Sequence, residues 1–401
     1  MGDRMIAERF PSPAVEVVGA LELEPRAGGG VRPRRLPAWT RRQIPSPAFD
    51  FVLRMTSGVR LAFSTSANAL ELEVSLLMID PGVVPPDPAR FDLVVDGVLV
   101  AQRVVGVESA ALVRPEDYEP LRPAPPVTVA FSGLGDAPKA VELWLPHGCA
   151  TELLELRSDA PLVPAVDARP RWVHHGSSIS QGGEAFSPTQ TWPVLAASLA
   201  GRARGASGHP GHPGELAGLR VQNLGFSGNA TGDPFVARTM RDLPADLLSA
   251  EIGINLVNAD LMRRRSFEPL LHGFIDTVRE GHPETPLLLI GPIPCPAVEE
   301  LPGPTITDPV AGTTRSGGDP AALAEGALSL GVVRDVLAAV LAARSDDPNL
   351  HYLDGWLLLP PEETGSLGDG LHPDAAALRR MGERFAVHAF GAGGPLDPWQ
   401  S

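Results

Sequence analysis

Four short segments of this chain contain residue types that carry out acyl transfer. They read Gly-Ser-Ser-Ile-Ser at 176–180, Asn-Leu-Gly-Phe-Ser-Gly-Asn at 223–229, Gly-Ile-Asn at 253–255 and Asp-Gly-Leu-His at 369–372. A serine hydroxyl attacks a carbonyl once a histidine removes its proton, and an aspartate fixes the tautomer of that histidine by accepting from Nδ1–H. Glycine lets a backbone N–H approach a substrate closely, and an asparagine amide can donate to an oxyanion. These residue types therefore predict a serine nucleophile, a histidine base with an aspartate partner, and an oxyanion hole.

Each segment also has an ordinary structural explanation. Serine and asparagine cap helices, glycine-rich turns join strands to helices, and Asp-Gly is a common turn. What favours the catalytic interpretation is the shared location, because all four lie at the ends of predicted strands or helices in one half of the chain. In open α/β sheets, ligands bind beyond the carboxyl ends of the strands.

The elements that must position these residues are short apolar strands that alternate with helices. This alternation predicts a parallel sheet in a three-layer α/β/α domain over residues 170–395. A long helix is predicted over 319–344, where Asp319 can cap and Pro320 can take the first helical position. The predicted strands are 172–176, 220–225, 246–253, 286–291 and 349–354, with further helices over 191–201 and 374–390.

In the first 165 residues, the apolar side chains recur with a different period. Leu70, Leu72, Val74 and Leu76 alternate with polar residues, as in a half-buried strand. Asp96-Gly97 within 91–100 predicts a two-residue hairpin turn. No long amphipathic helix is predicted here, so residues 1–165 are expected to form an antiparallel, jelly-roll-like β-sandwich as an accessory domain. The other predicted strands are 59–64, 127–131, 141–145 and 153–156, and residues 158–170 read as a linker.

Composition narrows the class of protein. The net charge of −15 opposes binding to phosphate backbones or anionic membranes, so no nucleic acid or membrane partner is expected. The chain has no apolar run of ~20 residues for a membrane span and no apolar leader at its N-terminus. A cytoplasmic location is therefore expected. Cys149 and Cys295 are far apart and are interpreted as buried thiols, although one disulfide stays open.

Three further features are interpreted as structural. His209 and His212 lie in a Gly/Pro-rich stretch at 201–218, where solvated side chains are favoured over metal ligands. His174 and His175 directly precede the serine segment and point to opposite faces of a strand, so structural roles are preferred for both. Residues 301–318 are predicted to be a loop.

The ordered set of segments resembles the sequence blocks of the SGNH/GDSL hydrolases, over about residues 170–392 and most clearly in Asp-Gly-Leu-His-Pro-Asp at 369–374. The resemblance implies a five-stranded parallel sheet between helices and no metal or organic cofactor. It assigns Ser178 as nucleophile, His372 as base and Asp369 as its partner. It also assigns Gly228 and Asn255 as oxyanion donors, together with the N–H of Ser178.

The chain departs from the family pattern at two positions. Ser177 replaces the aspartate of the usual Gly-Asp-Ser, which changes the hydrogen bonding of the turn and leaves Ser177 as a rival nucleophile. Leu256 follows Asn255, where the family usually has an aspartate, so a different packing of the loop after Asn255 is expected.

Three functions are compatible with these residues. The family default is an esterase that hydrolyses an ester or thioester through an acyl-enzyme on Ser178. The alternative is an acyltransferase that moves an acyl group from a CoA thioester to a hydroxyl of a small metabolite. The third is a carbohydrate-binding protein without catalysis, which the complete set of residues disfavours. The expected partner is thus a small-molecule ester, a thioester or an acetylated carbohydrate, and the oligomeric state is left open.

Overall fold

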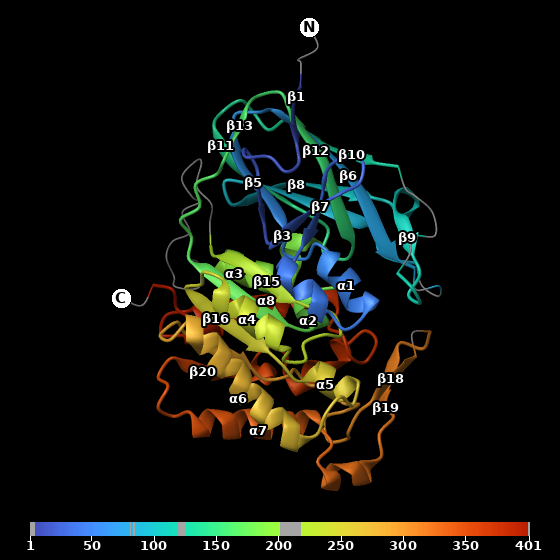
Figure 1. Ribbon diagram of the computed structural model, residues 1–401, viewed down its shortest axis with the longest axis vertical. Coiled ribbons are helices and arrows are strands. Elements are labelled where there is room, and N and C mark those ends of the chain that lie inside the picture. Colours follow the sequence, from blue (N-terminus) through green and yellow to red (C-terminus); the bar gives the residue numbers. More distant parts are fainter. Residues whose placement is uncertain are drawn as a thin grey trace. The chain divides into compact units, whose positions relative to one another are not determined.

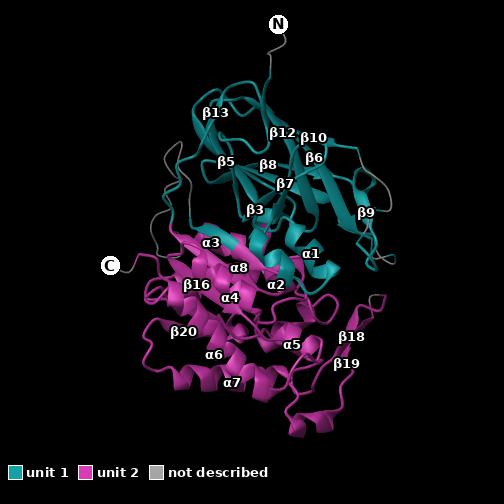
Figure 2. Cartoon of the chain, viewed as in Figure 1, with its two compact units in different colours: residues 1–169, 187–189, 206–222 teal, residues 170–186, 190–205, 223–401 magenta. Residues whose placement is uncertain are grey.

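The computed structural model describes residues 5–80, 82, 85–118, 120, 125–200, 218–308 and 310–399. Two compact units are distinguished (Figure 2). The first consists of residues 1–169, 187–189 and 206–222, and the second of residues 170–186, 190–205 and 223–401. His209 and His212 lie outside the described residues, so their interpretation is untested.

The first unit contains two β-sheets (Figure 1). One has the order β10-β6-β12-β4-β3, with β1 on β12 and β9 on β6, and the other has the order β13-β5-β11-β7-β8, with β2 on β5. Among the described residues of this unit, the strand pairs are antiparallel except β6 with β9. The strands are β1 (Ile6–Arg9), β2 (Glu16–Val18), β3 (Glu22–Pro25), β4 (Val31–Arg34), β5 (Arg60–Thr65), β6 (Ala69–Ile79), β7 (Ala89–Val95), β8 (Val98–Val105), β9 (Ala111–Val113), β10 (Val127–Ser132), β11 (Lys139–Trp144), β12 (Ala150–Ser158) and β13 (Leu162–Val163).

Alternating side chains build the core between these sheets. Leu72 and Val74 of β6 and Leu61 and Phe63 of β5 are fully buried in one hydrophobic cluster. Asp96 and Gly97 join β7 to β8 with φ of 49° and 75°, the positive values that a type I′ turn needs. The predicted β-sandwich is therefore confirmed.

The sequence pattern missed one helix in this unit. α1 (Pro47–Arg54) begins where the Ser46 side chain accepts from the N–H of Phe49, with Pro47 in the first turn. It is too short to give a clear helical period, but Phe49, Phe51 and Leu53 are buried. A 3₁₀ helix, η1 (Ala38–Gln43), precedes it.

The second unit is built on a five-stranded sheet with the order β15-β14-β16-β17-β20. Its pairs β14–β16, β16–β17 and β17–β20 are parallel, which confirms the predicted α/β architecture. The strands are β14 (Arg171–Gly176), β15 (Arg220–Gly225), β16 (Leu247–Glu251), β17 (Leu287–Ile290) and β20 (Leu350–Leu353).

Helices cover both faces of this sheet. Trp172 of β14 stacks on Phe385 of α8 and also contacts Trp192 of α3, whereas His175 stacks on Phe274 of α6. Since side chains alternate along a strand, α3 and α8 lie on one face and α6 on the other. The described helices after residue 170 are α2 (Ser178–Gln181), η3 (Pro188–Gln190), α3 (Trp192–Leu199), α4 (Pro234–Asp242), α5 (Ile254–Asn258), α6 (Arg264–Gly281), η5 (Pro320–Glu325), α7 (Leu330–Ala343), η6 (Gly355–Leu357), η7 (Pro361–Ser366) and α8 (Ala375–Phe390); most of η3 belongs to the first unit.

Two predictions for this unit were wrong in detail. The single helix expected over 319–344 is divided into η5 and α7, because Gly326 adopts φ of 86° and ends the first piece, while Ser329 caps the second. The loop expected over 301–318 contains an antiparallel hairpin, β18 (Thr305–Asp308) with β19 (Thr313–Ser316).

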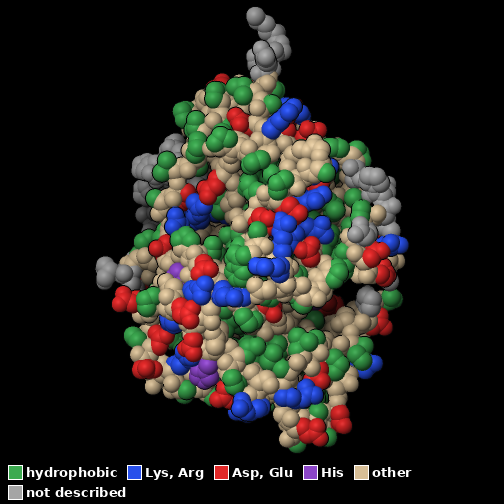
Figure 3. Space-filling view, viewed as in Figure 1, with side chains coloured by type: hydrophobic (Ala, Val, Ile, Leu, Met, Phe, Trp, Pro, Cys, Tyr) green, Lys and Arg blue, Asp and Glu red, His purple; other side chains and the backbone are tan. Residues whose placement is uncertain are grey.

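No helix among the described residues is long and apolar enough to cross a membrane. On the face seen in Figure 3, acidic and basic side chains are intermixed. Cys149 and Cys295 are both buried free thiols, in agreement with the favoured interpretation.

Candidate active site

The serine segment is a tight turn between β14 and α2. Ser177 caps α2, and its hydroxyl accepts from the N–H of Ile179 at 3.3 Å. A Cβ on Gly176 would lie 2.3 Å from Ser180 Oγ, so only glycine fits there. The turn places Ser178 at the start of α2, beyond the carboxyl end of the strand.

Ser178, His372 and Asp369 form one chain of hydrogen bonds. Ser178 Oγ lies 2.9 Å from His372 Nε2, and His372 Nδ1 lies 2.7 Å from Asp369 Oδ2. The other oxygen of Asp369 accepts from the backbone N–H groups of Leu371 and His372 at 2.9 and 2.7 Å. Asp369 therefore fixes the imidazole with its proton on Nδ1, which leaves Nε2 free to accept from the serine.

Neighbouring groups determine the charges of Asp369 and His372. Burial disfavours the Asp369 carboxylate, but the hydrogen bonds from the ring and backbone of His372 outweigh it and hold the pKa of Asp369 well below its usual range. Burial likewise disfavours the His372 imidazolium, but Asp369 and the charge of Glu184 raise the pKa of His372 above its ordinary value. The arrangement thus stabilises the imidazolium that forms when the serine loses its proton.

The β18–β19 hairpin supports the turn that carries Asp369. Thr314 Oγ1 donates to the carbonyl oxygen of Asp369 at 2.7 Å, and Cys295 Sγ donates to the carbonyl of Gly370 at 3.4 Å. Gly370 has φ of 80°, and a Cβ there would lie 2.9 Å from the N of Thr314. Residues 301–318, which were expected to be a loop, therefore help to hold Asp369 in position.

The other two expected oxyanion donors, Gly228 and Asn255, lie on the second and third of the four segments. Gly228 is exposed and has φ of 71°, a conformation that favours glycine. Asn255 Oδ1 accepts from the N–H of Ala230 at 2.8 Å, which fixes the amide and leaves its NH₂ group to donate elsewhere. This bond also ties the turn of Gly228 to that of Asn255. The roles of Gly228 and Asn255 in an oxyanion hole stay predictions.

The two neighbouring serines differ in environment. Ser177 is fully buried, and its N–H donates to Glu251 Oε2 at 3.0 Å. Ser178 is partly exposed and is the one bonded to His372. This geometry favours Ser178 as the nucleophile, an assignment that remains a prediction.

His174 and His175 are both completely buried. The ring of His174 bridges Ser249 Oγ and Ser180 Oγ, each at 2.8 Å, and His175 Nδ1 lies 2.8 Å from the carbonyl of Leu224. Burial lowers the pKa of both rings, that of His175 to about 4. They are neutral groups that tie β14 to its neighbours.

Sequence reasoning missed Glu251, Glu184 and Thr314. One signal was available for Glu251, since a carboxylate at the end of the apolar run Leu-Leu-Ser-Ala-Glu-Ile is costly unless it has partners. Glu184 and Thr314 gave none, because only the tertiary fold brings them to His372 and Asp369. Among the described residues, no group of three or more His, Cys, Asp or Glu could hold a metal.

Comparison with known protein families identifies the family of this chain. The model of the GDSL-like lipase/acylhydrolase family matches residues 175–380, just over half of the chain. The chain belongs to this family. The matched span contains all of the residues assigned above, and the fold is that of an SGNH domain with a β-rich region before it. No curated protein matches the chain.

Solved structures extend the similarity to nearly the whole chain. A salicylyl-acyltransferase, SsfX3, from a tetracycline biosynthetic pathway has 28% identity and a TM-score of 0.73, and 95% of each chain is covered. A GDSL-like lipase from Bacteroides ovatus has 18% identity and a TM-score of 0.61, with 95% of this chain and 96% of that one covered. A family two carbohydrate esterase from Cellvibrio japonicus has 12% identity and a TM-score of 0.53, with 96% of each covered. The last two comparisons show the fold alone. The family match supports an enzyme that acts on esters.

Proposed function

We propose that this protein cleaves an ester or thioester through an acyl-enzyme on Ser178. The observation that carries the proposal is the unbroken chain of hydrogen bonds from Ser178 Oγ through His372 to Asp369. His372 Nε2 takes the serine proton while Oγ forms a bond to the acyl carbon. The bond from that carbon to the leaving oxygen or sulfur then breaks, and the imidazolium returns its proton to the leaving group.

The negative charge on the carbonyl oxygen needs donors on the opposite side. We assign this role to the N–H groups of Ser178 and Gly228 and the amide of Asn255. The N–H of Ser178 is in the first turn of α2 and has no acceptor within the helix. The amide of Asn255 is oriented by Ala230, so it need not reorganise when the charge develops.

The second step needs an acceptor with an O–H group. His372 removes its proton, its oxygen attacks the acyl carbon, and the bond to Ser178 breaks as the proton passes to Oγ. With water the enzyme is an esterase, the family default. With a hydroxyl of a small molecule it is an acyltransferase. The second candidate is favoured by one observation, the similarity over 95% of both chains to a salicylyl-acyltransferase at 28% identity.

Covalent labelling tests the acyl-enzyme. Wild-type protein treated with a fluorophosphonate is expected to gain one label, seen by intact mass, and S178A to gain none. The exposed Ser198 on α3 provides a matched control, since S198A should be labelled like the wild type. Labelled S178A, or wild-type protein that stays unlabelled, would overturn the proposal.

Product analysis separates the two acceptors. An aryl ester or acyl-CoA is incubated with the enzyme, with and without an added small alcohol. Release of free acid alone, unchanged by the alcohol, indicates hydrolysis. A new ester of the alcohol, formed in wild type and absent in S178A, indicates transfer.

A further inference from the structure

A buried carboxyl group lies directly beneath the nucleophile turn. Glu251 is the last residue of β16, the strand that pairs with β14 in parallel. Its Oε2 accepts from the N–H of Ser177 at 3.0 Å, and the Ser177 hydroxyl bonds to the same carboxyl group. Since Ser177 immediately precedes Ser178, these bonds hold the peptide unit that enters the nucleophile.

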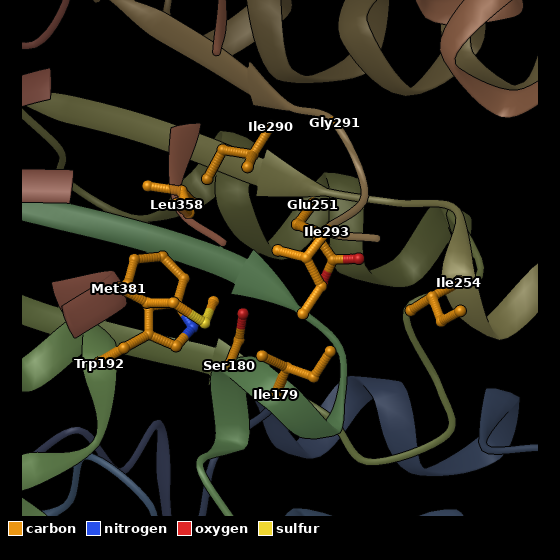
Figure 4. Close-up of a pocket in the computed structure, with 10 residues that line it drawn as sticks. All are labelled: Ile179, Ser180, Trp192, Glu251, Ile254, Ile290, Gly291, Ile293, Leu358 and Met381. Atoms are coloured by element: carbon orange, nitrogen blue, oxygen red, sulfur yellow. The ribbon is translucent and has the colours of Figure 1, made fainter. Parts of the chain in front are cut away.

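The surroundings of Glu251 are apolar. Together with Ile254, Ile290 and Ile293, it lines a small cavity with a volume of about 20 Å³ (Figure 4). Glu251 is 9% exposed, and among the described residues no basic side chain is paired with it. Burial raises the pKa of Glu251 above its ordinary value, although the hydrogen bonds from Ser177 oppose the rise.

A buried carboxyl group without a cationic partner is expensive to keep. A leucine of similar size would suit the isoleucine-lined cavity better, so packing alone does not explain a glutamate here. Ser177 is also the position at which this chain lacks the aspartate of the family motif. The carboxyl group that the turn lacks in its own sequence is supplied by the neighbouring strand.

We propose that Glu251 is a positioning residue for the nucleophile: by accepting from the N–H and hydroxyl of Ser177, it orients the Oγ and N–H of Ser178 toward the reacting carbonyl. The inference rests on the proposed function of Ser178. It assigns to Glu251 no contact with substrate, and its effect reaches the chemistry only through the backbone of 177–178.

Three substitutions at Glu251 separate positioning from packing. E251L suits the apolar cavity but leaves the buried N–H of Ser177 without an acceptor. The two effects on stability oppose each other, so the midpoint of urea unfolding should stay close to that of wild type. A misplaced nucleophile costs up to about 10²-fold in rate, so kcat of E251L and its rate of fluorophosphonate labelling should both fall by that order, with KM little changed. E251Q, the matched variant, keeps an acceptor oxygen and should stay within about threefold of wild type. E251D shortens the side chain by one methylene and should be intermediate.

Moving the carboxylate from position 251 to position 177 provides an independent test. S177D places a second carboxylate against Glu251, and like charges in a buried site disfavour each other, so S177D should be slow. Combining it with E251Q removes one of the two charges and should recover at least tenfold over S177D alone. Wild-type kcat in E251L, or E251Q as slow as E251L, would overturn the inference, as would no recovery in the double variant. Failure of the proposed function would look different, because the wild-type protein itself would not be labelled.

Discussion

At the scale of single residues, the charge of His372 is set by two carboxylates with different tasks. Asp369 is bonded to the ring and fixes its orientation. Glu184 is exposed in the turn that follows α2, and its charge raises the pKa of His372. The first is part of the proposed mechanism, and the second adds to the rise in the pKa of His372.

Replacing Glu184 should therefore shift the pH profile without changing the chemistry. The base must be neutral to accept the serine proton, so kcat/KM rises with pH through the pKa of His372. E184Q removes a charge that raises this pKa, so the acid limb should move to lower pH with the same plateau. The profile of hydrolysis of an aryl ester checks this. Because Glu184 is exposed, the difference from wild type should shrink at high salt. A limb that stays in place or moves to higher pH would contradict the role given to Glu184.

Asn255 can be tested by separating its donor from its acceptor. N255A removes both, and loss of one oxyanion donor typically costs about 10²–10³ in kcat. N255D keeps the oxygen that accepts from Ala230 but removes the amide donor, so it should be at least as slow as N255A. Steady-state kinetics of both variants, with their urea unfolding compared with wild type, distinguish a lost donor from a loosened turn. A near-normal kcat in N255A would remove Asn255 from the proposed oxyanion hole.

At the scale of elements, polar contacts between distant segments decide where the site residues stand. The β18–β19 hairpin holds the Asp369 turn through Thr314, and the buried His174 ties β14 to β16 through Ser249. Within the first unit, Glu142 of β11 is 4% exposed and binds Arg60 of β5 and Arg169, both at 2.7 Å. A carboxylate with two buried guanidinium partners is costly to remove, because the cations stay behind.

Glu142→Ala should accordingly destabilise the first unit by about 3–5 kcal/mol. Burial disfavours the ionised form, but Arg60 and Arg169 outweigh it and lower the pKa of Glu142. A group with a lowered pKa stabilises the fold above its unfolded pKa and loses this effect as the pH falls through the folded value. The difference between wild type and Glu142→Ala in urea unfolding should thus be largest near neutral pH and shrink in acid. Hydrogen exchange of the β5 and β11 peptides locates the loss, and equal stability of both proteins at neutral pH would refute the prediction.

At the scale of the whole molecule, the family assignment and the architecture agree. The family model covers the second unit from β14 into α8, and the similarity to the salicylyl-acyltransferase covers nearly the whole chain, including the β-rich first unit. The net charge of −15 is distributed over a surface on which, in the view of Figure 3, both signs are intermixed. In the proposed mechanism either acceptor uses the same base, so the choice between water and an alcohol depends on the surroundings of the acyl-enzyme.

The sequence by itself determined those features that depend on neighbouring residues. Apolar runs of period two or continuous runs predicted the strands, Asp96-Gly97 predicted its turn, and the helix predicted over 374–390 is α8. The spacing of Asp369 and His372 suffices for their mutual bond, because three residues of one turn bring both side chains together.

Only the tertiary structure decided what depends on distant residues. Ser178 and His372 are 194 positions apart, and their bond exists because β14 and the start of α8 meet at the same end of the sheet. Glu251 under Ser177 and Thr314 on the Asp369 turn are likewise products of strand order and hairpin packing, which no local period encodes. The break of the predicted helix at Gly326 and the short α1 also escaped local reasoning. The sequence therefore sufficed to predict the family and the fold of this protein, and the tertiary structure was needed to find the residues that hold the proposed site in place.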